Sequence, residues 1–183
     1  MNKTQYYILP ILGIIAVLLL GWSTISAQTI EKLENQYREI EALPSGSVFD
    51  LIITDDDMSG AASEYLIRFK NEIQEMVQQT TGMELELADP VVEFKTDKTA
   101  VSLKVGKGFL KVSVSIQAEI TWDGDIHVNV TSVDVPIVSI DPATVNSYIE
   151  GPVRQGMRKL EEKYEILDLN VGDGMITIRA MKK

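Results

Sequence analysis

The stretch LKVSVSIQAEITW, residues 110–122, alternates apolar and polar side chains without interruption. Successive side chains of a β-strand point to opposite faces, so this pattern predicts one long strand with one buried face and one solvent-exposed face. Asp123-Gly124 then supplies hairpin turn chemistry, and residues 126–130 resume the alternation on a returning strand. The stretch therefore predicts an antiparallel sheet, because such sheets commonly bury only one face.

A helix is predicted on the N-terminal side of this sheet. Residues 48–53 have the composition of a short strand, and Thr54 follows as an N-cap. Apolar side chains then recur with helical spacing to about residue 80. Gly60 indicates a bend or a short capping helix before the long one.

A second helix and a final hairpin are predicted on the C-terminal side. Asp141 and Pro142 have the pattern of an N-cap followed by proline in the first turn. Gly151-Pro152 interrupts the helical pattern, which predicts a kink or two consecutive helices. Residues 166–180 alternate around a glycine-rich turn and predict a C-terminal hairpin. This order of elements predicts an α+β fold.

The N-terminus contains a long apolar run. Residues 6–22, YYILPILGIIAVLLLGW, carry no charge, and a membrane-spanning helix needs roughly 20 apolar residues, with about 17 as the lower limit. We expect an N-terminal transmembrane anchor or a signal segment; a buried core helix is the further alternative. Lys3 precedes the run and Glu31 is the first acid after it, which places the C-terminal domain outside the cytoplasm. The expected location is the cell membrane, with a single pass, or the outside if the segment is cleaved.

Three regions follow from these patterns. Residues 1–27 form the transmembrane or signal segment, and residues 28–46 form a juxtamembrane helix and linker. Residues 47–183 form the extracytoplasmic α+β domain, which begins where Pro44-Ser45-Gly46-Ser47 breaks the helical pattern.

The composition excludes several classes of function. The chain has 17 Lys and Arg against 27 Asp and Glu, so it lacks the excess of cations that nucleic-acid binding requires. The absence of cysteine and the single histidine, His127, remove thiol chemistry, most zinc sites and histidine-dependent triads. Asp55-Asp56-Asp57 lacks the spacing of an EF-hand and suits a helix start. We expect no enzyme activity, metal or cofactor, and the residues identify no protein partner.

The apolar faces of the first predicted helix and of the long strand provide the candidate binding site. If they do not fill the space between them, the groove would accept an acyl chain, each buried methylene contributing about 0.8 kcal/mol. A void of roughly 300 Å³ or more would favour this hypothesis. The alternative is a fully packed core in a non-catalytic, membrane-anchored interaction module that acts through its acidic surface. The candidate groove residues are Tyr65, Leu66, Phe69, Ile73, Met76, Val112, Val114, Ile116, Ile120 and Trp122.

Three segments resemble small bacterial tubular lipid-binding (TULIP, BPI-like) proteins. They are IITDDDM at residues 52–58, the central strands over residues 112–136, and LDLNVGDGMITI at residues 167–178. The resemblance covers about residues 47–181. It implies a highly twisted antiparallel sheet wrapped around a long helix, with an apolar interior that binds lipid. It also implies lipid transport or envelope maintenance for a membrane-tethered protein and carries no catalytic residue, whereas the strongly acidic surface departs from the family.

Overall fold

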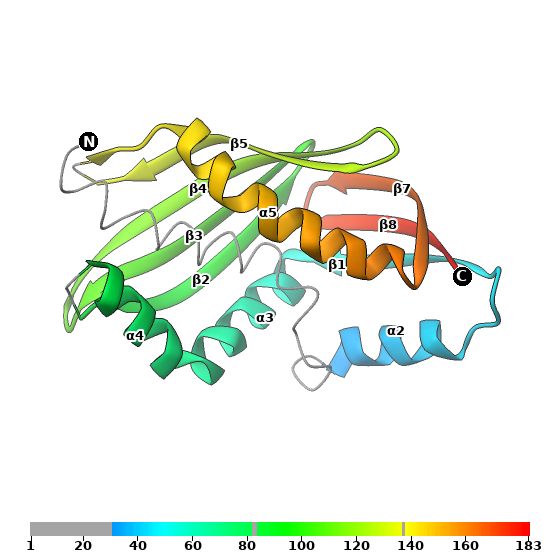
Figure 1. Ribbon diagram of the computed structural model, residues 1–183. Helices are drawn as coiled ribbons and strands as arrows, with labels where there is room; N and C mark the ends of the chain where they lie inside the picture. Colours follow the sequence, from blue (N-terminus) through cyan, green and yellow to red (C-terminus); the bar gives the residue numbers. More distant parts are fainter. Residues whose placement is uncertain (1–30, 82–83, 137) are drawn as a thin grey trace.

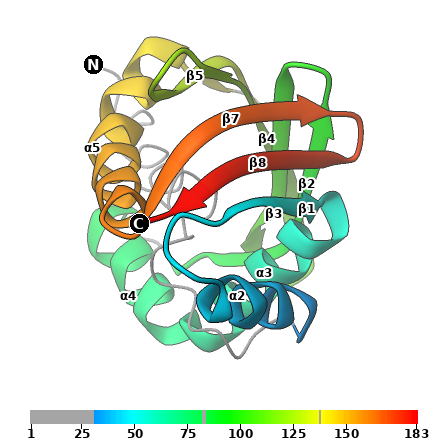
Figure 2. The same cartoon turned by 90° about the vertical axis from the view of Figure 1, so that its right-hand side faces the viewer.

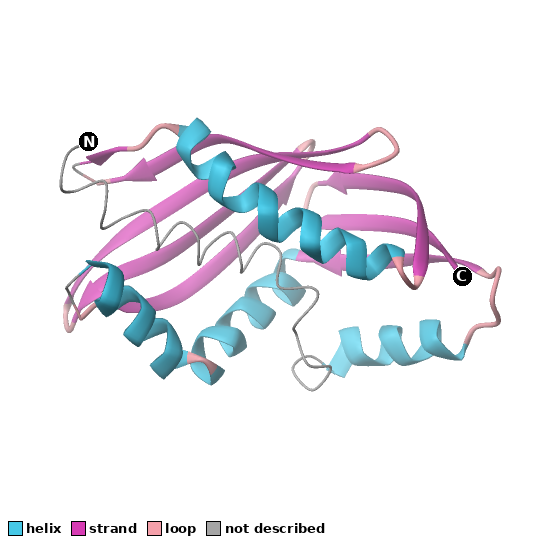
Figure 3. Cartoon of the chain, in the orientation of Figure 1, coloured by secondary structure: helices cyan, strands magenta, loops and turns pink. Residues whose placement is uncertain are grey.

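The fold is α+β, with antiparallel strands arranged in two sheets (Figure 1, Figure 3). The computed structural model describes residues 31–81, 84–136 and 138–183, and the predicted membrane segment over residues 1–27 lies outside them. Within the described ranges, no helix is both long enough and apolar enough to cross a membrane.

The larger sheet contains the long alternating stretch as its central strand. Its strands lie in the order β2-β3-β4-β5-β6, and β4 covers Leu110–Trp122. The β4 strand pairs with β3 over residues 110–118 on one side and with β5 over residues 115–122 on the other. The other strands of this sheet are β2 (Glu86–Lys95), β3 (Lys98–Lys107), β5 (Ile126–Val135) and β6 (Val138–Ser139).

The smaller sheet joins the two ends of the domain. Strand β1 (Val48–Thr54) pairs antiparallel with β8 (Met175–Lys182), which also pairs with β7 (Tyr164–Gly172). Figure 2 shows these strands crossing in front of the larger sheet, with α5 on one side and α2 and α3 below. The amide of Gly174 donates to the carbonyl of Phe94 at 2.9 Å, which ties the β7–β8 turn to the larger sheet.

The main core lies between the larger sheet, helix α5 (Pro142–Glu161) and the smaller sheet, which contributes Ile53, Val171, Ile176 and Ile178. Leu103 and Ile116 from the sheet and Val145 and Ile149 from α5 are each 1% exposed. The α5 helix continues through Gly151-Pro152, so the alternative of two consecutive helices is wrong. Buried Ile149 and Val153 lie on either side of that dipeptide, and their packing compensates for the hydrogen bond that proline cannot donate.

The first predicted helix is divided into α3 (Asp55–Arg68) and α4 (Lys70–Thr81). The break occurs at Phe69, where φ is −105° and ψ is 24°, whereas Gly60 lies inside α3. The Phe69 ring packs against the preceding turn, where its centroid lies 4.7 Å from the centroid of the Tyr65 ring. The expected interruption near Gly60 is therefore wrong in position, because the chain turns where aromatic side chains pack rather than where glycine lowers helix propensity.

Side chains at the start of α3 satisfy the free backbone groups of β2. Asp55 Oδ1 accepts from the amide of Phe94 at 2.6 Å, and Ser59 Oγ accepts from the amide of Val92 at 2.8 Å. Ser59 also donates to the carbonyl of Val92 at 3.3 Å. An open strand edge would present these groups to another chain, so α3 protects the β2 edge.

Helix α5 protects β5 in the same way through one side chain. Asn146 Oδ1 accepts from the amide of Val130 at 2.7 Å, and Asn146 Nδ2 donates to the Val130 carbonyl at 3.1 Å. Asn146 thus pairs with Val130 as the backbone of a neighbouring strand would.

Helix α2 (Glu31–Ala42) falls within the predicted juxtamembrane helix and packs against the domain. Buried Ile40 contacts Tyr164 and Ala180, and the Tyr164 hydroxyl donates to Glu41 at 2.8 Å. Hydrogen bonds from Tyr164 and Tyr37, together with the Lys163 ammonium, lower the pKa of Glu41 to about 2. The helix is therefore attached to the domain by both apolar and charged contacts.

Candidate functional site

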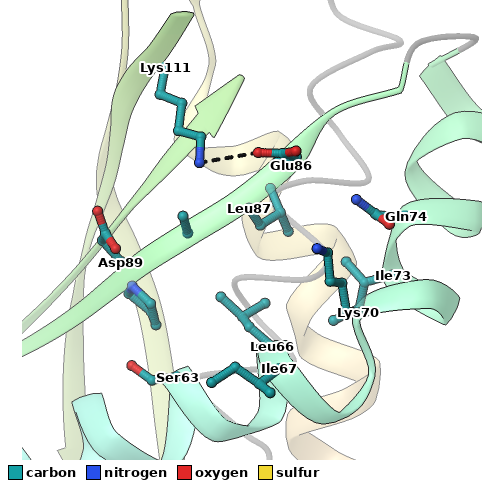
Figure 4. A pocket seen from close by; sticks show the side chains of 12 residues that line it. Ser63, Leu66, Ile67, Lys70, Ile73, Gln74, Glu86, Leu87, Asp89 and Lys111 are labelled. Carbon is teal, nitrogen blue, oxygen red and sulfur yellow. Dashed lines mark ion pairs between the residues drawn. The ribbon is translucent and has the colours of Figure 1, made fainter. Parts of the chain in front are cut away.

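A pocket of about 350 Å³ lies between α3, α4 and the first half of β2 (Figure 4). Its volume falls within the range of small-molecule sites, roughly 300 to 1,000 Å³. It is lined by Ser63, Leu66, Ile67, Lys70, Ile73, Gln74, Glu86, Leu87, Ala88, Asp89, Pro90 and Lys111.

Two irregularities of the backbone shape this pocket. The break at Phe69 separates α3 from α4, and each of these helices contributes lining residues. Strand β2 loses its regular register between Ala88 and Val91, and Asp89 has a positive φ of 50°. Proline cannot donate to a strand ladder, so Pro90 favours a bulge at this position. The bulge leaves the first half of β2 beside the two helices.

The pocket combines an apolar lining with a polar rim. Leu66, Ile73, Leu87 and Pro90 contribute aliphatic surface, and Figure 4 shows Lys70 and Gln74 beside it. This mixture suits an amphiphile, whose apolar part needs burial and whose polar end needs a hydrogen-bonding partner.

The ion pairs at the rim differ between its two lysines. Lys111 Nζ lies 3.2 Å from Glu86 Oε2 on the neighbouring side of the pocket. Lys70 forms no ion pair with any other residue whose side chain the structure describes. Lys70 is therefore the lining cation most accessible to an acidic group of a ligand.

The structure places the predicted helix residues around this pocket. Leu66 and Ile73 are buried and line it. Tyr65 and Phe69 pack against the small apolar cluster that Leu66 and Ile73 form with Ala62. The side chain of Met76 lies outside those described. The four predicted helix residues whose side chains are described thus lie at or beside the pocket.

The predicted strand residues lie elsewhere. Val114 and Ile116 belong to the main core, with 3% and 1% of their surface exposed, and Ile120 packs against it. Trp122 is half-buried near the end of β4, and Val112 is 46% exposed. None of these five residues lines the pocket, to which β4 contributes only Lys111 from its opposite face. The structure therefore does not bring the two predicted halves together around it.

The lining residues on β2 were missed because hydrophobic alternation does not identify them. Ala88, Asp89 and Pro90 interrupt the pattern of their strand. Proline within a strand pattern points to an edge or a bulge, and helix α3 was available to cover an edge. That signal could have placed β2, rather than β4, beside the predicted helix.

The acidic residues considered for metal binding have other roles. Asp57 forms a capping box with Thr54, and Asp55 bonds to β2. His127 lies at the surface with Nε2 2.9 Å from Asp123 Oδ1, and both side chains are more than half exposed. Within the described residues, no group of His, Cys, Asp and Glu side chains is arranged to hold a metal ion.

Comparison with known proteins gives no assignment, because no family model, curated protein or solved structure matches the chain. Any function proposed for it therefore depends on the pocket and on the sequence.

Proposed function

We propose that this protein binds an acyl chain or a similar hydrophobic ligand in the pocket between α3, α4 and β2. The observation that carries the proposal is the pocket of about 350 Å³ with aliphatic residues in its lining. Each methylene group buried there would contribute about 0.8 kcal/mol, so a segment of ten carbons would gain about 8 kcal/mol before association costs.

The polar rim favours an amphiphile over a pure hydrocarbon. The Lys70 ammonium and the Gln74 amide lie on the α4 side of the pocket and can both donate hydrogen bonds. An acidic head group at this position would keep its contact with water while its chain enters the pocket. The proposed ligand is therefore a lipid with an acidic head group, such as a fatty acid.

The wider arrangement is part of the same proposal. The uncharged run at residues 6–22 would tether the protein to the cell membrane, with the domain outside the cytoplasm. The resemblance to tubular lipid-binding proteins supports a twisted sheet wrapped around a helix and a role in lipid transport or envelope maintenance.

The test uses the full chain in membranes and a photoactivatable fatty acid that carries a diazirine on its acyl chain. After irradiation, cross-linked peptides are mapped by mass spectrometry. We expect them in α3, α4 and the first half of β2. Ala88→Phe would fill part of the pocket, and excluding only two methylene groups costs about 1.6 kcal/mol, or more than tenfold in affinity.

The matched control is Ala100→Phe on β3. Ala88 and Ala100 are both half-buried and lie on the same outer face of one sheet, but only Ala88 lines the pocket. Cross-linking should fall in Ala88→Phe and persist in Ala100→Phe. Cross-links spread evenly along the chain, or equal yields in the two variants, would rule out this pocket.

The second candidate is a membrane-anchored interaction module without a ligand. The dense core around Val114 and Ile116 favours it, because the apolar face of β4 is already covered there. In that case the pocket would yield no specific cross-links, and binding to a partner through the acidic surface would weaken with salt.

A further inference from the structure

The turn between β3 and β4 presents apolar side chains to solvent. Phe109 is 95% exposed, Leu110 is 70% exposed and Val112 is 46% exposed. We call these three residues the apolar tip. Isolated exposed apolar residues are common on protein surfaces, but neighbouring ones at the apex of a hairpin form a patch that calls for an explanation.

The hairpin holds the apolar tip firmly in place. Gly108, with a positive φ of 60°, occupies the first position of the two-residue turn, and Lys107 pairs with Leu110 directly beneath it. At Gly106 the strands approach so closely that an added Cβ would lie 1.9 Å from the Leu110 carbonyl oxygen. The exposed rings and methyl groups therefore project from a regular, tightly paired ribbon.

The tip extends beyond the folded core. The first four residues of β4 are exposed on both faces, whereas burial begins at Val114. Solvent surrounds the Phe109 ring on nearly every side, so a flat protein surface would cover only part of it. A fluid apolar medium covers such a projection on all sides at once.

The charges around the tip are compatible with a lipid surface. Residues 98–118 contain four lysines and no acid, in a chain whose net charge is −10. Three of these lysines pair with acids near the start of β2, at Asp89, Glu84 and Glu86. The hairpin is thus locally neutral, and its approach to a bilayer avoids the repulsion that the acidic remainder of the domain would meet at anionic head groups.

Lys107 and Lys111 flank the apolar tip in the arrangement typical of membrane interfaces. Their aliphatic stems can follow Phe109 and Leu110 toward the hydrocarbon region while the ammonium groups, paired with Glu84 and Glu86, stay at the level of the lipid head groups. The apolar tip also adjoins the pocket, because Lys111 lines the pocket. Lys107 Nζ lies 3.1 Å from Glu84 Oε2, and Glu84 follows α4 closely in the chain. Figure 1 shows the β3–β4 turn at the same end of the sheet as the C-terminal end of α4.

From these observations we propose that the apolar tip inserts into the surface of a lipid bilayer and brings the mouth of the pocket to the membrane. The proposed function explains why the tip would contact a membrane, and in that respect the inference rests on it. The contact itself is argued from the hairpin alone. It assigns the hairpin a partner, a bilayer surface, that the pocket alone does not require.

The absence of cysteine makes a site-specific test possible in the full chain. Phe109→Cys is labelled with an environment-sensitive nitrobenzoxadiazole dye and reconstituted into phosphatidylcholine and phosphatidylglycerol vesicles that contain doxyl-labelled lipid. We expect a blue-shifted emission that the doxyl groups quench. The matched control is Leu167→Cys on β7, an exposed apolar position, whose label should remain in water and unquenched.

A second variant tests the contribution of the apolar side chains themselves. Ser113 is an exposed residue of the same hairpin, and a label on Ser113→Cys should report the insertion without altering the tip. Adding Phe109→Ser and Leu110→Ser should remove its quenching, because burial of each residue shifts the equilibrium by roughly tenfold or more. Both positions are exposed, so the fold should tolerate these changes.

The outcomes separate this inference from the proposed function. An unquenched label at position 109, or equal quenching at positions 109 and 167, would overturn the membrane contact. A blue shift without quenching by lipid would show that protein covers the tip, and would also overturn it. Quenching at 109 without fatty-acid cross-links in the pocket would leave the membrane contact in place and remove the proposed ligand.

Discussion

The contact between Asn146 and Val130 offers a quantitative test of how the larger sheet is completed. Asn146→Ala removes two partly buried hydrogen bonds to the backbone of β5, at 2.7 and 3.1 Å. Each such bond stabilises a protein by about 1 kcal/mol net, so the expected loss is about 2 kcal/mol. The third bond of Asn146, to the exposed Asn129 side chain, is expected to contribute little.

An opposing effect reduces this figure. Alanine has a higher helix propensity than asparagine by roughly 0.6 kcal/mol, and Asn146 lies within α5. The net loss in the free energy of unfolding is therefore about 1.5 kcal/mol. For a domain of this size that corresponds to a decrease in Tm of about 3 to 6 °C.

The assay is urea unfolding of the full chain in mild detergent, followed by tryptophan fluorescence. Ser147→Ala is the control, since the Ser147 hydroxyl donates to the carbonyl of Thr144 within the same exposed helical turn and not to β5. Hydrogen exchange provides a local measurement, because the amide of Val130 should exchange about tenfold faster in Asn146→Ala than in the wild type. If Asn146→Ala unfolds like the wild type and Val130 keeps its protection, water satisfies this edge and the account of α5 is wrong.

Two further predictions concern single polar groups. The hydroxyl of Thr99 is buried, with 1% of the residue exposed, and has no hydrogen-bond partner among the described residues. Thr99→Val should therefore raise the free energy of unfolding by about 1 kcal/mol in denaturant titrations, whereas Thr121→Val at an exposed position of β4 should change it by less than about 0.5 kcal/mol. The pKa of Glu41 is lowered from 4.5 to about 2, so its ionised form stabilises the docking of α2 fully when the pH is above 4.5. This contribution is lost as the pH falls toward 2. The stability difference between wild type and Glu41→Gln should accordingly be present near neutral pH and vanish in acid; a difference that is independent of pH would contradict the role of the Glu41 charge.

The local structure of the larger sheet is predictable because the alternation of apolar and polar side chains in a strand depends only on residues that are neighbours in the sequence. The alternation over residues 110–122 delimits β4 and also identifies its buried face from Val114 onward. The turn at Asp123-Gly124 and the N-cap at Asp141 follow from side-chain chemistry within a few residues.

Alternation cannot show where a strand stops being covered. Val112 continues the pattern of Val114 and Ile116, yet it is 46% exposed because β4 extends past the core. The sequence pattern reports which side of a ribbon is apolar, and burial depends on whether another element reaches that part of the ribbon. The apolar tip is consequently visible only in the folded chain.

Some features of the candidate site were likewise predictable from the sequence, and others were not. By itself, the sequence determined the α+β class, the apolar stripe that contains Leu66 and Ile73, and the absence of cysteine chemistry, because these depend on composition and on spacing within one segment. Tertiary structure decided that this stripe meets β2 rather than β4 and that β1 pairs with β8. Such pairings depend on which distant surfaces fit together and on where a bulge redirects a strand, and no local period of the sequence encodes either one.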